Sequence, residues 1–244
     1  LNDTHPSIAI PEMMRILIDD HGLSWDIASK LTRETFAYTN HTILPEALET
    51  WSEDLIGHLL PRHLQIIKEL DRKFHIQVAR RFPEEFDKAY QMGIVTGDGG
   101  KVVNMARLAI VGSHAVNGVS RLHSELLKSH VFNDFYLMYP EKFRNVTNGI
   151  THRRWLLSAN PGLASLITEA IGDGWTHDLE ELRKIEPMAE DAAFRDRFNA
   201  VKKENKLRLC RAMERVFNFT LETDLLLDCQ VKRFHEYKRQ LLNV

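Results

Sequence analysis

Several features that mark particular protein classes are scarce or missing in this sequence. Cysteine occurs only at Cys210 and Cys229 among 244 residues, which excludes a disulfide scaffold and leads us to expect a reducing, cytoplasmic compartment. No apolar run reaches the ~20 residues that a membrane helix needs. The opening residues LNDTHPSIAI lack the basic and apolar regions of a signal peptide, so we expect none there. The formal net charge is only -2, so we expect neither nucleic acid nor a membrane surface as partner.

Motifs for metal ligation and nucleophilic catalysis are also missing. Twelve histidines occur, yet His235-Glu236 is followed by Arg239 where an H-E-x-x-H motif needs its second histidine. The sequence has no Cys-x-x-Cys and no G-x-S-x-G, and Ser113-His114 has only adjacency to suggest a nucleophile. The segment Gly97 to Lys101 matches neither common phosphate-loop pattern, which favours a surface hairpin turn. We therefore expect no metal site.

The hydrophobic pattern predicts that the first part of the chain is mostly helical. Apolar residues recur at helical spacing in five segments: 11–21, 24–36, 46–60, 60–82 and 121–131. In the second segment Ile27, Leu31 and Phe36 form the predicted apolar face. The segment 103–114 is apolar enough for a buried helix, but the pattern does not distinguish a helix from a strand there.

Turn-forming residues divide the chain near residue 149. A turn-rich connection begins around Asn148-Gly149, so we predict one domain over residues 1–149 and another over residues 150–244. In the second domain, residues 194–217 form a predicted amphipathic helix. Residues 225–231 form a predicted short buried strand that leads through a basic turn into a final helix. Strand, turn and helix in this order open a βα unit.

Cations gather where that predicted strand ends, at Lys232, Arg233, Lys238 and Arg239. Ligands of open α/β sheets lie beyond the carboxyl ends of strands, and an anion there also meets the free N–H groups of the following helix. A phosphate site is one interpretation, and a solvated basic helix start is the other. The spacing alone leaves both interpretations open.

Three polar clusters fall where loops are expected, at residues 2–5, 38–42 and 147–149. Their Asn, Asp, Thr and His side chains supply both hydrogen-bond donors and acceptors, which suits the recognition of sugar hydroxyl groups. The same residue types are preferred in turns and helix caps. Each cluster by itself is therefore also explained by local structure.

Taken together, these segments resemble the α-glucan phosphorylases, the family that acts on glycogen, starch and maltodextrins. Six segments carry the resemblance, in family order and spread over nearly the whole chain: LNDTHP (1–6), YTNHT (38–42), LPRHLQII (60–67), SHAVNGV (113–119), VTNGIT-RRW (146–155) and VKR-HEYKRQLLN (231–243). One departure is His152, which stands where the family has proline.

The resemblance implies an α/β fold, as a predominantly helical segment of a GT-B architecture with two Rossmann-like lobes. Residues 1–149 would be the latter part of the N-terminal lobe, and residues 150–244 the connection and the start of the C-terminal lobe. The implied reaction is phosphorolysis of the terminal α-1,4-glucosyl bond of a glucan. Its partners would be the glucan, inorganic phosphate and α-glucose 1-phosphate, in a homodimeric parent enzyme.

The resemblance also implies roles for individual residues. Arg233 and Lys238 would hold the substrate phosphate, while Lys232 and Trp155 would lie near the cofactor, pyridoxal 5'-phosphate. The residues near the glucosyl unit or the acceptor sugars would be Asp3, His5, His41, Asn148 and Tyr237, with His41 acting through its backbone carbonyl. The cofactor lysine of the family lies in a later segment, so we expect these residues alone to be inactive.

Two other functions remain open at this point. A nucleotide-sugar glycosyltransferase of the same architecture would share the basic strand end, but would not be expected to carry YTNHT and NGIT-RRW together. A non-catalytic glucan-binding module would bind saccharide with no dependence on phosphate. In the phosphorylase interpretation, sugar should bind better when phosphate is present.

Overall fold

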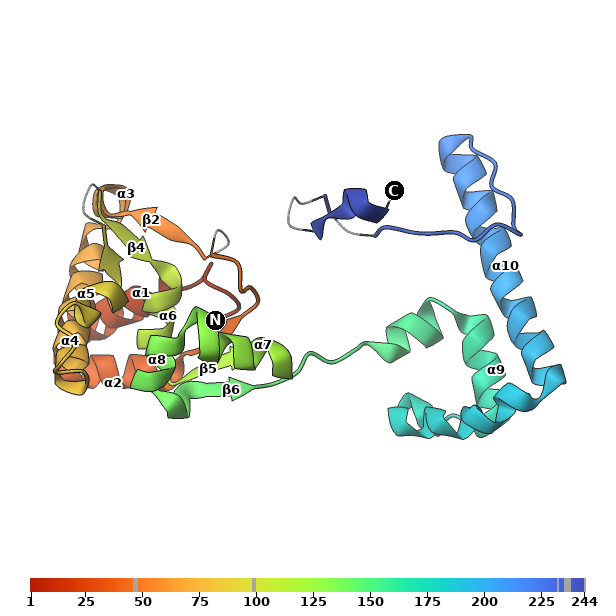
Figure 1. The fold of residues 1–244 in the computed structure, drawn as a ribbon, viewed down its shortest axis with the longest axis horizontal. Helices are drawn as coiled ribbons and strands as arrows, with labels where there is room; N and C mark the ends of the chain where they lie inside the picture. The colour runs from red at the N-terminus through yellow and green to blue at the C-terminus, as the bar shows by residue number, and fades with distance from the viewer. Residues whose placement is uncertain (46–47, 98–99, 232, 235–237, 244) are drawn as a thin grey trace. The chain divides into compact units, whose positions relative to one another are not determined.

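The chain folds into two compact units, Leu1–Gly149 and Ile150–Val244 (Figure 1). The structure is a computed structural model, and it describes residues 1–45, 48–97, 100–231, 233–234 and 238–243. Both units are mostly helical, and the described strands form two small sheets in the first unit. The assignment of the two units to the lobes of a larger enzyme stays a prediction.

A parallel sheet organises the first unit. Its strand order is β1-β5-β6, and the strands span Ala37–Asn40 (β1), Ala115–Gly118 (β5) and Phe143–Asn145 (β6). Alternate residues are buried along β1 and β5, as expected for strands that present one face to a core. The register pairs Asn40 with Gly118 and Gly118 with Asn145, so the three strands end at one edge.

The first residues of the chain extend this sheet. Asn2 forms a parallel bridge with Thr39, and the Thr39 N–H donates to the Leu1 carbonyl while the Asp3 N–H donates to the Thr39 carbonyl, both at 2.9 Å. Leu1 to Asp3 therefore runs beside β1 in the same direction. The residues after Asp3 leave from the same edge as the ends of the three strands.

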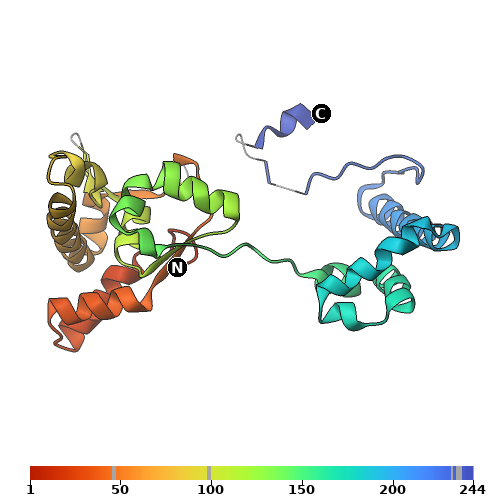
Figure 2. The same cartoon turned by 60° about the horizontal axis from the view of Figure 1, so that its bottom comes forward.

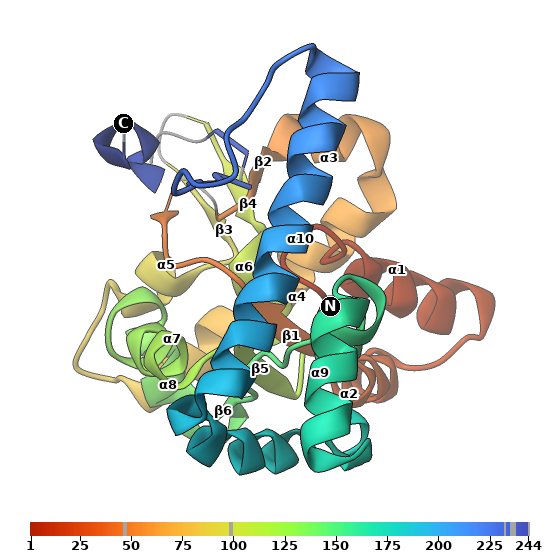
Figure 3. The ribbon, with the colours of Figure 1, turned by 90° about the vertical axis from the view of Figure 1, so that its right-hand side faces the viewer.

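A small antiparallel sheet and a set of helices complete the first unit (Figures 1 and 3). The strand order of the small sheet is β2-β4-β3, with bounds Thr50–Ser52 (β2), Val95–Thr96 (β3) and Val102–Asn104 (β4). The helices are α1 (Ala9–Arg15), η1 (Ile16–Asp20), α2 (Trp25–Thr35), α3 (Glu53–Leu59), α4 (Pro61–Arg81), α5 (Lys88–Met92), α6 (Met105–Val111), α7 (Arg121–Leu126), η3 (Leu127–Val131), α8 (Asn133–Met138) and η4 (Pro140–Lys142).

Two hydrophobic clusters hold the first unit together, and α4 and α6 contribute to both. In one cluster, Phe74 of α4 stacks on Phe135 with ring centroids 5.7 Å apart, beside the buried Tyr38 and Val116 of the sheet. In the other, the residues of α4 pack with those of α1 and α6. The predicted helix over 60–82 is confirmed as α4, and its 3.6-residue period explains how one helix reaches both clusters.

In the first unit, the structure differs from two sequence predictions and resolves one segment that the sequence pattern left ambiguous. The helix expected from residue 46 begins only at Glu53, because Thr50–Ser52 pairs with β4 and the Ser52 hydroxyl caps α3 by accepting from the Leu55 N–H. Ile27 and Leu31 are exposed, and α2 buries Ala28 and Thr32 instead. The ambiguous segment 103–114 becomes β4 followed by α6.

The second unit is a helical assembly with a small core (Figure 2). Its elements are η5 (Arg154–Ser158), α9 (Pro161–Ile171), η6 (Gly174–Thr176), η7 (Leu179–Glu190), α10 (Ala192–Phe217) and η9 (Gln240–Asn243). Ala164, Ile167 and the fully buried Trp175 form the core. Asp191 caps α10 by accepting from the Ala193 N–H at 2.9 Å, which explains where this helix begins.

The predicted βα unit of the second domain does not form in the described residues. The segment 225–231 has no strand assignment, and Leu226 is 97% exposed. Residues 235–237 of the predicted final helix lie outside the described residues, and Gln240–Asn243 forms a short 3-10 turn. A strand needs a neighbour to satisfy its backbone groups, and the described part of this unit offers none. The predicted helix over 194–217 is confirmed as α10, although it buries no residue.

The described residues contain no helix with both the length and the apolar character that crossing a bilayer requires. They also contain no group of three or more His, Cys, Asp or Glu side chains arranged to hold a metal ion.

Candidate functional site

The carboxyl edge of the parallel sheet is the candidate site. Four parallel segments end there, namely Leu1–Asp3, β1, β5 and β6. The structure brings four of the predicted site residues to this edge, where they immediately follow or end these segments: Asp3, His5, His41 and Asn148. Parallel sheets place ligands beyond the carboxyl ends of their strands because the polar loops that leave the strands converge there.

Asn40, the last residue of β1, is the fully buried centre of this edge. Its amide nitrogen donates to the Tyr38 hydroxyl at 3.0 Å, and its Oδ1 accepts from the Thr42 N–H at 3.0 Å. Oδ1 also accepts from the His123 imidazole at 2.9 Å. A buried amide with both ends satisfied fixes the backbone around it, so the exposed His41 leaves the strand in a defined direction.

His123 connects α7 to this strand end. Its Nδ1 accepts from the Val119 N–H at 3.1 Å, so the ring proton that reaches Asn40 is carried on Nε2 and the imidazole is neutral. Burial lowers the pKa of His123, and the neighbouring His41 lowers it further. His123 lies outside the six family segments quoted above, and only its packing in three dimensions reveals this role.

The side chain of Glu49 contacts the two residues that follow Asp3, namely Thr4 and His5. Its carboxylate accepts from the buried Thr4 hydroxyl at 2.9 Å and from the Trp51 indole at 3.2 Å, and it lies 3.6 Å from Nδ1 of His5. Asp3 itself has a left-handed φ of 64°, and its Oδ1 accepts from the Thr4 N–H at 2.9 Å. Such a conformation is uncommon for a residue other than glycine, and here it turns the chain out of the sheet.

The segment after β6 lies against the end of β5. The Val146 N–H donates to the Asn117 side chain at 2.7 Å, and the Asn148 N–H donates to the Val119 carbonyl at 2.9 Å. These bonds hold the backbone of Asn148 at the sheet edge and leave its side chain exposed. The edge thus presents a carboxylate, imidazoles and an amide to solvent, a donor and acceptor set that suits sugar hydroxyl groups.

The remaining predicted site residues belong to the second unit. Trp155 lies in η5 and is 55% exposed. The exposed Arg233 accepts through its carbonyl from the Lys238 ammonium at 3.0 Å. Lys232 and Tyr237 lie outside the described residues. The structure therefore brings together the predicted sugar-binding residues of the first unit, and the predicted phosphate-binding residues stay a prediction.

The comparison with protein families decides which family this architecture represents. The sequence model of the carbohydrate phosphorylases matches residues 1–244, the whole chain. The chain belongs to the carbohydrate phosphorylase family. This confirms the resemblance that the six sequence segments indicated.

The names of individual relatives are consistent with this family assignment. The chain is 52% identical over 243 residues to the liver form of glycogen phosphorylase from Bos taurus. It is 54% identical over 243 residues to the muscle forms from Oryctolagus cuniculus and Homo sapiens. Each alignment covers 100% of this chain and 29% of the relative, so the phosphorylase chain spans less than a third of the length of these curated relatives.

Proposed function

We propose that the protein containing this chain is an α-glucan phosphorylase. It uses inorganic phosphate to cleave the terminal α-1,4-glucosyl bond of glycogen or a related glucan and releases α-glucose 1-phosphate. Family membership over the whole chain supports this reaction. The observation that carries the proposal is the convergence of four polar residues at one sheet edge: Asp3, His5, His41 and Asn148. The complete enzyme would have the two Rossmann-like lobes of a GT-B fold and act as a cytoplasmic homodimer.

The sheet edge would bind the terminal glucosyl unit. Asn148 offers an amide that both donates and accepts, whereas Asp3 offers a carboxylate that accepts from hydroxyl groups. The carbonyl of His41 accepts no hydrogen bond from the described residues, so it is available to a sugar hydroxyl. The Asn40–His123 contact holds the backbone that carries this carbonyl.

The basic segment of the second unit would bind the substrate phosphate. Arg233 and Lys238 would supply charge-assisted hydrogen bonds to the dianion, and Tyr237 would lie near the sugar hydroxyls. The held phosphate would then balance the positive charge that develops at the anomeric carbon, and the His41 carbonyl dipole would add to this stabilisation. These roles rest on the family resemblance and on the residue types present.

The same unit would contribute part of the lining for pyridoxal 5'-phosphate. The indole of Trp155, which is 55% exposed in η5, offers the flat apolar surface that a planar ring requires. Lys232 would add a cation near the cofactor phosphate. When bound, the cofactor supplies a phosphate group that acts as proton donor to the substrate phosphate. In the family, the lysine that would hold the cofactor belongs to a later segment of the sequence.

The test is phosphate-dependent turnover by the intact protein. We expect glucose 1-phosphate to form from glycogen and inorganic phosphate, and Asn148→Ala to lower kcat/KM for the glucan by about tenfold or more, the loss of one good polar contact. Asn199→Ala, which changes an exposed residue of α10, is the matched control and should leave turnover unchanged. Saccharide binding without any phosphate dependence would instead indicate a binding module, and turnover only with a nucleotide sugar would indicate a glycosyltransferase.

A further inference from the structure

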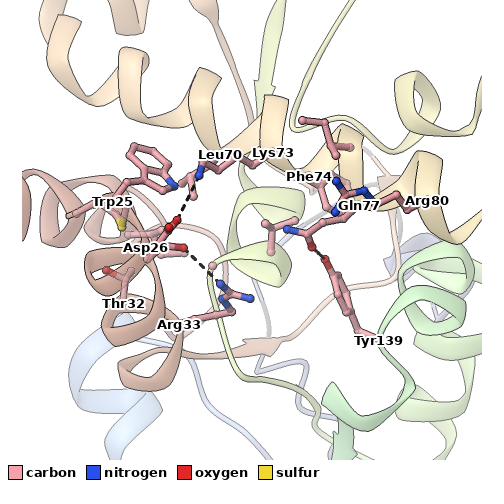
Figure 4. A pocket seen from close by; sticks show the side chains of 16 residues that line it. Trp25, Asp26, Thr32, Arg33, Leu70, Lys73, Phe74, Gln77, Arg80 and Tyr139 are labelled. Carbon is pink, nitrogen blue, oxygen red and sulfur yellow. Dashed lines mark hydrogen bonds and ion pairs between the residues drawn. The ribbon is translucent and has the colours of Figure 1, made fainter.

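A cavity of about 350 Å³ lies in the first unit between α2 and α4 (Figure 4). Its lining includes Arg33 before β1, Gly112 before β5 and Tyr139 before β6. In a parallel sheet, the segments that precede the strands lie at the amino edge, opposite to the candidate site. We call it the amino-edge cavity. Its volume falls within the range of about 300 to 1,000 Å³ that is usual for small-molecule sites.

Positive charge predominates in the amino-edge cavity. Three cations line it, Arg33 from α2 and both Lys73 and Arg80 from α4, against the single carboxylate of Asp26. Asp26 pairs with Lys73 at 3.3 Å. Neither arginine forms an ion pair with a carboxylate among the residues that the structure describes. Among the residues that the structure describes, the Arg33 guanidinium forms one hydrogen bond, a long one of 3.4 Å to the Ser29 hydroxyl.

The cations stand beside apolar and aromatic surface. Trp25 forms part of one wall, and the Lys73 ammonium lies 5.6 Å from the centre of its ring. Buried Phe74 and Leu70 contribute further apolar lining. Figure 4 shows Arg33 and Lys73 entering this space from different helices, with Tyr139 donating to Gln77 at one side, across 2.9 Å.

The charge of Arg33 also reaches the wall formed by the segment before β6. Burial raises the pKa of Tyr139 to about 12 and lowers that of Lys142 to about 7, and the charge of Arg33 lowers both. The Lys142 ammonium lies 4.2 Å from the centre of the Tyr139 ring. Arg33 therefore adds positive charge near this wall, where the carboxylate of Glu141 opposes it. The three cations that line the cavity against one carboxylate favour an anion as the ligand.

We propose that the amino-edge cavity binds a small organic anion, with a phosphate or carboxylate head on Arg33 and an apolar or aromatic body against Trp25. Lys73 and Arg80 add positive charge around the head. A guanidinium suits both head groups, because its fixed fork of donors matches two oxygens of either anion. The inference concerns the opposite edge of the sheet from the candidate site and does not depend on the proposed function.

The experiment measures tryptophan fluorescence of the intact protein during titration with phenyl phosphate, benzoate, benzyl alcohol and inorganic phosphate. We expect a saturable change with phenyl phosphate or benzoate, and the tighter of the two identifies the preferred head group. Benzyl alcohol lacks the charge and inorganic phosphate lacks the apolar body, so both should bind about tenfold more weakly or worse. Trp25→Phe should abolish the fluorescence change, whereas Trp51→Phe should retain it.

Charge variants locate the head group. Arg33→Gln should weaken binding of the preferred anion by about tenfold or more, while Lys30→Gln, an exposed position on the same helix, should leave it unchanged. Lys73→Gln gives a second variant if Arg33→Gln fails to fold. Equal binding of benzyl alcohol, equal binding of inorganic phosphate, or no saturable change in the intact protein would each overturn the proposal. So would a fluorescence response that persists in Trp25→Phe.

Discussion

The imidazole of His123 donates through Nε2 to Oδ1 of Asn40 across 2.9 Å, although 83 positions separate the two residues in the sequence. This bond joins the first turn of α7 to the end of β1. It completes the hydrogen bonding of an amide that has no exposed surface, and it fixes the strand end from which His41 leaves. The geometry of the candidate site therefore depends on a side chain from α7, outside the strands that form the edge.

Replacement of His123 by alanine should weaken both the fold and the site. The change leaves the Val119 N–H without its acceptor and removes a donor from Asn40, so we expect a loss of about 1–3 kcal/mol in the free energy of unfolding. In the intact enzyme, glucan turnover should also fall, because the His41 carbonyl is less well positioned. Chemical denaturation and phosphorolysis kinetics measure the two effects. His130→Ala, at an exposed position on η3, should change neither, and wild-type behaviour of His123→Ala would contradict this role.

The pH dependence of stability should report the same histidine. Burial lowers the pKa of His123 below its usual 6.5, so the unfolded chain takes up a proton at a pH where the folded protein does not. This contribution to stability is complete above about pH 6.5 and is lost as the pH falls through the lowered pKa of the folded state. Denaturation of the wild type and of His123→Gln across this range should show a stability difference that shrinks with acid. A difference that grows with acid would show that the pKa is raised.

Gly118 should not tolerate a side chain. A Cβ at this position would lie 2.3 Å from Oγ and 2.8 Å from Cα of Ser124, and the second contact is with backbone that cannot rotate away. Gly118→Ala should therefore destabilise the protein by about 1–3 kcal/mol through overpacking between β5 and α7. Thermal unfolding measures the loss. Gly149→Ala has open space around the new Cβ and serves as the control, so equal stability of the two variants would refute the predicted clash.

Lys142 should give stability a second pH dependence, at alkaline pH. Its side chain is buried, and Nζ donates to the Ile110 carbonyl at 2.9 Å, near the end of α6. Burial lowers its pKa from 10.5 to about 7, so between these values the unfolded chain holds a proton that the folded protein has released. Stability should rise with pH through this window and be complete above the unfolded pKa. Denaturation at several pH values should show this rise in the wild type and its absence in Lys142→Gln; parallel curves would contradict it.

Much of the local structure follows from the sequence pattern. The apolar period between Pro61 and Arg81 predicts α4, and the same reasoning predicts α10. Such predictions succeed because helical hydrogen bonds are made within the segment itself. The six segments that resemble the phosphorylases similarly indicated the family, which the match over the whole chain confirms. Their order and residue types are properties of the sequence and need no folding.

Other features could not be predicted because they depend on partners distant in the sequence. The strand Thr50–Ser52 exists because β4 lies beside it, and the predicted strand at 225–231 fails because the described part of its unit supplies no neighbour. Ile27 and Leu31 have helical spacing, yet the core packs against the adjacent face of α2. Glu49 stands in no motif, and only the folded chain brings its carboxylate to Thr4 and His5.

The sequence by itself determined the helical periods, the turn-rich break near Gly149 and the polar residue types that suit sugar recognition. Only the tertiary structure decided that those residues meet at one edge, because parallel strands from four distant segments must first pair in register. It also decided that Asn40 is buried and bound to His123, and that arginine and lysine side chains surround a cavity at the opposite edge. Residue types and short-range spacing can be read along the sequence. Which side chains meet at one place in the fold depends on which distant segments pack together.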